Sequence, residues 1–202
     1  MRVLKTLFMI HCLSLSACSL IPSEDTPMAQ YIFELPTMPT GKARATTKIL
    51  QVAMPQATAG FDSQGMTYTR RPAQLERYNK SQWVDTPAHM LLPLLVRSLE
   101  ASAQYQAVLS ANTSNLAGEI RVDTEILQLQ QEFISQQASR VRVVLRVQIF
   151  DLVEHKVLAT QVFELSETAP SEDAQGYVLA TNQALSKWLP VFQAFVNKAI
   201  YG

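Results

Sequence analysis

Residues 140–149 constrain the fold more than any other stretch, because polar and aliphatic side chains alternate along them. The aliphatic positions are Val141, Val143, Leu145, Val147 and Ile149, and arginine or glutamine occupies most positions between them. Successive side chains of a strand point to opposite faces of its sheet, so the pattern predicts a strand with one buried and one solvated face. The buried face requires a second layer of structure to cover it.

The C-terminal segment provides such a layer. Residues 171–200 are predicted to form a long helix, with Pro190 introducing a kink. The stripe at alternating three- and four-residue steps consists of Val178, Thr181, Leu185, Trp188, Phe192, Phe195 and Ala199. Leu189 and Val196 widen the stripe, which suits packing across a sheet better than a narrow coiled-coil seam.

A second helix is predicted to begin at Thr86-Pro87, with threonine as its cap and proline in its first turn. Its apolar stripe consists of Leu92, Leu95, Val96, Leu99 and Ala103. Pro93 lies inside this pattern, so the helix is expected either to start late or to bend there.

The remaining strands are predicted at 30–35, 48–54, 105–109, 120–129 and 156–165, with a hairpin of 66–71 and 75–78 around Arg71-Pro72-Ala73. The alternation changes parity near Ile126, which predicts a bulge. The strand over 156–165 is expected to pair with 140–149 across a turn at 153–155. This order of elements predicts an α+β fold, a mainly antiparallel sheet with two helices packed on one face.

The first eighteen residues have the layout of a secretory signal peptide. A basic start at Arg2 and Lys5 precedes an apolar run over 7–15 that is too short to span a bilayer as a mature helix. The segment closes on Leu15-Ser16-Ala17-Cys18, which resembles the lipobox of bacterial lipoproteins. That resemblance implies cleavage between Ala17 and Cys18 and lipidation of Cys18 with acyl chains such as palmitate. The alternative is an ordinary signal peptide with a chance cysteine, or an internal apolar helix.

Processing at Cys18 would divide the chain into a signal peptide (1–17), a lipidated cysteine with a flexible tether (18–29) and a domain (30–202). Cys12 would leave with the signal peptide, so the mature chain would enter an oxidising compartment without a free thiol. In lipoproteins of two-membrane bacteria, an aspartate after the cysteine marks retention in the inner membrane. By that resemblance Ser19 implies attachment to the periplasmic face of the outer membrane.

Charge and motif content exclude several classes of function. Loss of the signal peptide leaves 15 basic and 17 acidic residues, a near-neutral balance that offers no electrostatic footprint for nucleic acid. A zinc site needs three or four ligands, and the mature chain would offer only His89 and His155, without a usable cysteine. No cofactor motif is present. The sequence Phe61-Asp62-Ser63-Gln64-Gly65 lacks the first glycine of a nucleophile elbow and is interpreted as a turn. Asp123 and Glu125 form either an acid–base pair or part of a solvated strand face; we expect no enzyme.

A family resemblance rests on the central stretch. It is carried by Gly60-Phe61-Asp62, Met66-Thr67-Tyr68-Thr69-Arg70, Leu75, Tyr78, Trp83, Pro87, Met90-Leu91 and Leu99-Glu100-Ala101-Ser102, with Tyr31-Ile32-Phe33-Glu34-Leu35 at the start. Together these resemble the ABC-type transport auxiliary lipoprotein family over about residues 30–197. The sequence departs from the family pattern at Thr69, Val84, Thr86 and Pro93.

The resemblance implies a non-catalytic accessory of an ABC transporter and a mammalian-cell-entry (MCE) domain protein, which together move lipids or other hydrophobic solutes between the two membranes. Tyr68, Tyr78 and Trp83 are then either core packing or, with Arg70, a partner-binding patch. The alternatives are an assembly factor or plug for an outer-membrane β-barrel, and a periplasmic hydrolase. Homo-oligomer formation stays open, as do the transported molecule and the direction of transport.

Overall fold

The computed structural model describes residues 27–38, 40–42, 46–110, 118–135 and 138–202. Its elements in chain order are β1 (Ala29–Tyr31), β2 (Ile49–Val52), β3 (Gln56–Ala57), β4 (Gly65–Thr69), β5 (Glu76–Trp83), α2 (Pro87–Ala101), β6 (Ala107–Ser110), β7 (Ile120–Ser135), β8 (Ala138–Asp151), β9 (Lys156–Thr168) and α3 (Ala174–Tyr201). The expected signal peptide, Cys18 and Ser19 lie outside the described residues. Within the described ranges, neither helix is long and apolar enough to cross a membrane.

Strand β7 organises the sheet. One side of it pairs with β8 in antiparallel orientation, and β8 pairs with β9 in the same way. The other side of β7 pairs in parallel with β2, β3 and β4 in succession, so that Leu50 lies opposite Ile120 and Tyr68 opposite Gln131. The sheet is completed by β6 beside β2, β5 beside β4 and β1 beside β5. The long pairings are therefore antiparallel, as predicted, whereas several short ones are parallel.

The alternating strand over 140–149 forms the middle of β8. Its aliphatic side chains Val141, Val143, Leu145, Val147 and Ile149 are all buried. The arginines between them pair with carboxylates of the neighbouring strands, Arg140 with Glu132, Arg142 with Glu164 and Arg146 with Glu125. The register shifts between Ile126 and Gln128, which confirms the bulge and returns Leu129 to the buried face.

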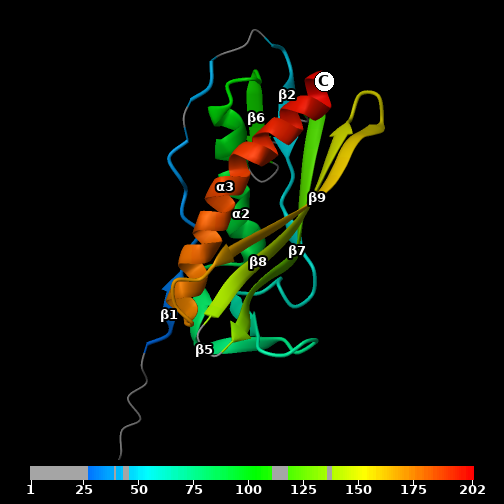
Figure 1. Ribbon diagram of the computed structural model, residues 1–202. Helices are drawn as coiled ribbons and strands as arrows, with labels where there is room; N and C mark the ends of the chain where they lie inside the picture. The colour runs from blue at the N-terminus through cyan, green and yellow to red at the C-terminus, as the bar shows by residue number, and fades with distance from the viewer. Residues whose placement is uncertain (1–26, 39, 43–45, 111–117, 136–137) are drawn as a thin grey trace, which may run out of the picture.

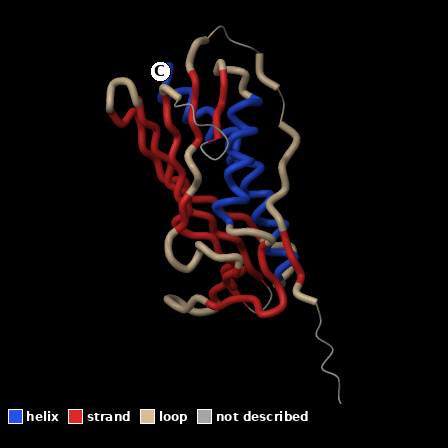
Figure 2. Tube along the Cα trace, turned by 180° about the vertical axis from the view of Figure 1, so that it is seen from behind, coloured by secondary structure: helices blue, strands red, loops and turns tan. Residues whose placement is uncertain are grey.

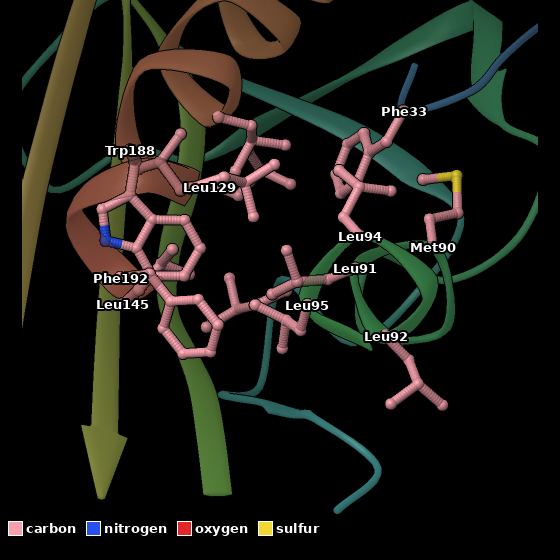
Figure 3. Close-up of a cluster of buried hydrophobic side chains, with 14 of the residues drawn as sticks. Phe33, Met90, Leu91, Leu92, Leu94, Leu95, Leu129, Leu145, Trp188 and Phe192 are labelled. Atoms are coloured by element: carbon pink, nitrogen blue, oxygen red, sulfur yellow. The ribbon is translucent and has the colours of Figure 1, made fainter. Parts of the chain in front are cut away.

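Both helices cover the buried face of the sheet and contact each other (Figure 1). The cap of α2 is Thr86, whose hydroxyl accepts a hydrogen bond from the His89 N–H at 3.4 Å, as predicted. The cap of α3 is Asp173, whose carboxylate accepts from the Gly176 N–H at 2.8 Å. Figure 3 shows the resulting core, in which Leu91 and Leu95 of α2 face Trp188 and Phe192 of α3.

Several boundaries differ from the sequence-based expectation, and the largest differences are that β7 continues to Ser135 and β5 to Trp83. The first strand ends at Tyr31 because the chain then leaves β5 and places Phe33 in the core, so 32–35 is not a strand. Ala103 lies beyond the end of α2, with a positive φ of 52°. Pro93 is exposed inside a continuous helix that begins at Pro87, so the helix does not start late.

Each helix contains an interior proline, and a change of axis direction is visible in α3. Pro190 also lies inside its continuous helix. The axis of α3 changes direction between its orange and red parts (Figure 1), which agrees with a proline-induced kink.

Figure 2 shows the same domain from behind. In both views β1 and the β4–β5 hairpin lie at the lower end of the molecule, and the C-terminus lies at the upper end.

Candidate partner-binding site

The β4–β5 hairpin holds all four candidate partner-binding residues, and three of them lie near its turn, away from Trp83 at the end of β5. Its strands pair in antiparallel orientation, with Tyr68 opposite Glu76. The turn between them contains Arg71-Pro72-Ala73, as predicted, and Ala73 takes the left-handed conformation at φ 62°. The Gln74 N–H donates to the Arg71 carbonyl at 3.2 Å, and the Thr69 hydroxyl donates to the same oxygen at 2.7 Å. The turn is therefore fixed by its own backbone and by one side chain.

The aromatic side chains of this hairpin form a cluster with a residue that the sequence did not single out. The rings of Tyr68 and Tyr78 lie 4.8 Å apart between centroids. The ring of Phe133, from the end of β7, lies 5.6 Å from that of Tyr68 in an edge-to-face arrangement. The parallel pairing of β4 with β7 makes this contact, because it places Tyr68 opposite Gln131, two residues before Phe133.

Arg70 covers the exposed side of the cluster. Its guanidinium carbon lies 4.6 Å from the centroid of the Phe133 ring and 5.3 Å from that of the Tyr68 ring. Such cation–π contacts contribute ~0.5–1 kcal/mol at exposed positions. Among the described residues Arg70 has no ion-pair partner, and its side chain is exposed. The rings therefore orient a cation whose N–H donors stay available to a carboxylate or phosphate of another molecule.

A hydrogen bond fixes each of the two tyrosines, Tyr78 through a buried residue and Tyr68 through a residue of the same hairpin. The Tyr78 hydroxyl donates to Gln131 Oε1 at 2.6 Å. Gln131 is fully buried, and its Nε2 donates to Ser139 Oγ at 2.7 Å and to the Ser171 carbonyl at 3.3 Å. The Tyr68 hydroxyl donates to Glu76 Oε2 at 3.0 Å. The cluster is thus attached to β7, β8 and the segment before α3.

The same surroundings shift the pKa values of both tyrosines. Burial, followed by the charge of Asp173, raises the pKa of Tyr78 above its ordinary value. Burial and the hydrogen bond to Glu76 raise the pKa of Tyr68. Both side chains are therefore neutral hydrogen-bond donors at physiological pH, and Arg70 is the charged member of the cluster.

An open hollow of about 590 Å³ lies beside the cluster. Arg70 and Phe133 line it, together with Ile134, Ser135 and Glu172. Ile134 is 63% exposed, so an apolar side chain and an exposed guanidinium border the same hollow. This mixture suits a protein surface that presents an acidic group next to apolar side chains.

The fourth candidate residue, Trp83, lies in the core instead. It is 1% exposed, and its ring contacts Phe33 at 5.0 Å and Tyr177 at 5.4 Å. Trp83 therefore takes the packing role that the sequence left open, and a partner cannot reach it in this conformation. Phe133 takes its place at the surface cluster.

The side chains considered for catalysis are held by structural contacts. Asp123 binds Arg121 at 2.6 Å, and Glu125 pairs with Arg146, which agrees with a solvated strand face. His89 contacts Asp85 at 3.2 Å, and His155 lies in the β8–β9 turn. The described part of the chain contains no group of three histidine, cysteine or carboxylate residues able to hold a metal ion.

Ser63 is held in a bend. Residues 59–64 form the predicted turn, in which Ser63 Oγ accepts from the Gly65 N–H at 3.4 Å. The candidate cleavage and lipidation residues Ala17 and Cys18 lie outside the described residues.

Comparison with known families decides the class of the protein. The family model of the ABC-type transport auxiliary lipoprotein component matches residues 32–189. The chain belongs to this family. It is accordingly an auxiliary lipoprotein component of an ABC-type transport system. The match includes the β4–β5 hairpin, all four residues of the aromatic cluster (Tyr68, Arg70, Tyr78 and Phe133) and α3 as far as residue 189.

Solved structures share the fold of this ABC-type transport auxiliary lipoprotein. The crystal structure of protein XCC0632 from Xanthomonas campestris, assigned to family DUF330, has a TM-score of 0.76 at 19% identity, covering 85% of this chain and 95% of that one. A crystal structure of an uncharacterised protein has a TM-score of 0.63 at 13% identity, covering 84% and 99%. At these identities the likeness shows the fold alone. No curated protein matches the sequence.

Proposed function

We propose that this auxiliary lipoprotein is a non-catalytic outer-membrane accessory of an ABC/MCE-type system that moves lipids or other hydrophobic solutes between the inner and outer membranes. The observation that carries the proposal is the exposed Arg70 guanidinium, which has no ion-pair partner among the described residues and is oriented by Phe133 and Tyr68 in a chain of this family. Arginine and aromatic side chains in clusters dominate many protein interfaces.

The partner is the periplasmic MCE-domain protein, which binds the cluster of Tyr68, Arg70, Tyr78 and Phe133. An acidic side chain of the partner would form a bidentate pair with Arg70, while its apolar side chains would fill the hollow beside Ile134. The internal hydrogen bonds of Tyr78 and Gln131 keep the cluster preorganised, so that little conformational entropy is lost on binding.

The attachment to the membrane is through Cys18, after cleavage behind Ala17. Lipidation with two or more acyl chains anchors a protein stably, whereas a single chain holds it only marginally. Ser19 directs the lipoprotein to the outer membrane. Membrane fractionation should place the wild type there, and Ser19→Asp should shift the protein to the inner membrane.

Cys18→Ala should abolish acyl labelling, and labelling that persists in this variant would contradict the lipobox interpretation.

Affinity purification from crosslinked membranes tests the transport role. The MCE-domain protein encoded by a neighbouring gene should be recovered with the wild type. Recovery of an outer-membrane β-barrel in its place would indicate an assembly factor or plug. Reproducible turnover of an ester or a glycan by the purified chain would indicate an enzyme.

A further inference from the structure

The β4–β5 hairpin carries a second group of cations besides Arg70. Arg71, Arg77 and Lys80 are all exposed. No carboxylate of the described residues lies within ion-pair distance of them. The one acidic residue of the hairpin, Glu76, is held by the Tyr68 hydroxyl. One hairpin therefore carries three exposed cations that have no ion-pair partner among the described residues, in a chain whose formal net charge is zero.

The opposite arrangement is found on the β7–β8 surface. There Arg121, Arg140, Arg142 and Arg146 each pair with a carboxylate of the same or a neighbouring strand. Charges on that surface are neutralised within the molecule. The hairpin cations are not neutralised by such pairs, so their charges stay available to an anionic surface.

The hairpin also exposes apolar side chains. Leu75, in the turn, is 43% exposed, and so is Val84 directly after β5. Cations interleaved with exposed aliphatic side chains suit the interfacial region of an anionic bilayer, where phosphates meet the cations and acyl chains meet the apolar groups.

The position of the hairpin brings it close to such a bilayer. Strand β1 pairs with β5, and Ala29 lies opposite Ser81, so the chain enters the domain beside the hairpin. Between Cys18 and Ala29 lie ten residues, which reach at most ~33–36 Å when fully extended. Strand β1, where the described chain begins, and the hairpin lie at the same end of the molecule (Figures 1 and 2).

We propose that Arg71, Arg77 and Lys80, with Leu75, form a lipid-contacting edge that lies on the anionic surface of the membrane carrying the anchor. This inference rests on the proposed lipidation of Cys18. The acyl chains provide the attachment, and the edge provides the orientation. Arg70 is held against Phe133 and stays with the partner-binding cluster, which the orientation places next to the bilayer.

The β8–β9 turn would then point away from the membrane. Val153 of this turn is 69% exposed and provides a control position (Figure 1). If Cys18 is acylated and Cys12 removed, a cysteine introduced at either position would be the only free thiol of the mature chain. A fluorophore can then be attached at Leu75→Cys or at Val153→Cys in the lipidated full-length protein.

The experiment reconstitutes each labelled protein into vesicles that contain a headgroup quencher. In phosphatidylethanolamine–phosphatidylglycerol vesicles, quenching at position 75 should exceed that at position 153 at least about twofold. The ratio should fall to about one in phosphatidylcholine vesicles, and it should decrease as salt rises from about 0.1 to 1 M, because screening shortens the reach of the charges.

A charge-reversal variant isolates the cations. Arg71→Glu, Arg77→Glu and Lys80→Glu together should remove the difference between positions 75 and 153. The matched control combines Lys42→Glu, Arg97→Glu and Lys198→Glu, three exposed cations elsewhere, and should keep it. Equal quenching at both positions in anionic vesicles, by protein that floats with them, would overturn the orientation alone. Failure of the wild type to float would overturn the lipid anchor and, with it, the orientation.

Discussion

The helix–sheet core and the β4–β5 hairpin both contain clusters of aromatic side chains, but the two clusters are built differently. In the core, the Trp188 ring lies 5.1 Å from Phe192 and 5.8 Å from Phe163, and all three side chains are buried. In the hairpin, Tyr68, Tyr78 and Phe133 are only partly buried. The core is stabilised by apolar area, whereas the hairpin is fixed by hydrogen bonds and leaves Arg70 exposed.

Because of this difference, we expect the core to determine the free energy of unfolding and the hairpin surface to determine partner binding. A buried aromatic ring contributes through the area removed from water and through its close contacts. The exposed Arg70 contributes little to the free energy of unfolding but presents unused hydrogen-bond donors. Substitutions in the core should therefore change stability, whereas substitutions at the surface of the hairpin should change partner binding.

The largest effect is expected in the core. Phe192 is fully buried, so Phe192→Ala should lower the free energy of unfolding by roughly 3–5 kcal/mol, through lost burial and the cavity left behind. Val191, its neighbour on α3, is 52% exposed, and Val191→Ala should change stability by less than about 0.5 kcal/mol. Urea denaturation of both variants checks this. Similar losses in the two would show that the α3 stripe does not form the core.

Alkaline pH should weaken both regions. Burial raises the pKa values of Tyr177 in the core, of Tyr105 and of Tyr78 in the hairpin cluster. Near pH 10 the unfolded chain therefore loses tyrosine protons that the folded chain keeps. The stability is fully present below about pH 10 and should decrease as pH rises above it. Denaturation midpoints between pH 8 and 11 measure the slope, and Tyr78→Phe should reduce it; a flat profile would contradict the raised pKa values.

A smaller effect is expected from the hydrogen bond between Tyr78 and Gln131. Gln131 is fully buried, so Tyr78→Phe leaves its Oε1 without the hydroxyl donor and should cost about 1–2 kcal/mol. Tyr68→Phe is the control, because its hydroxyl meets the partly exposed Glu76 carboxylate and should cost less. Thermal unfolding of the two variants compares them. A larger loss for Tyr68→Phe would mean that the hairpin is not held from the inside.

The sequence predicted the parts of the fold that depend on local periodicity. The alternation over 140–149 identified β8 and its buried face, and the stripe from Val178 to Phe192 identified the core-facing side of α3. The α2 cap at Thr86 and the bulge at Ile126 were also predicted. Each of these signals lies within a few neighbouring residues.

Long-range pairing was not predictable in the same way. The parallel pairing of β2, β3 and β4 with β7 joins residues more than sixty positions apart through backbone hydrogen bonds, which carry no side-chain pattern. The same pairing brings Phe133 to Tyr68, so Phe133 was missed. The one indication in the local sequence was that Phe133, like Leu127 and Leu129, occupies an odd-numbered position after the bulge and so points to the same face of the strand. The sequence did not decide whether Trp83 lies in the core or at the surface. The register of β4 with β5 shifts between Gly65 and Thr67, so simple alternation does not tell which face Trp83 occupies.

The binding of an Arg70→Glu variant to the MCE-domain protein that we propose as its partner tests the proposed partner-binding site most directly. The variant should keep its free energy of unfolding to within about 1 kcal/mol, because Arg70 is exposed and loses only its cation–π contacts with Phe133 and Tyr68. Its affinity for the MCE-domain protein should fall at least about tenfold, since the proposed pairing gives Arg70 an acidic partner that the glutamate would repel. Lys198→Glu, an exposed cation at the far end of α3, should bind like the wild type. Equal affinities of the wild type and Arg70→Glu would contradict the proposal that this cluster is the partner-binding site.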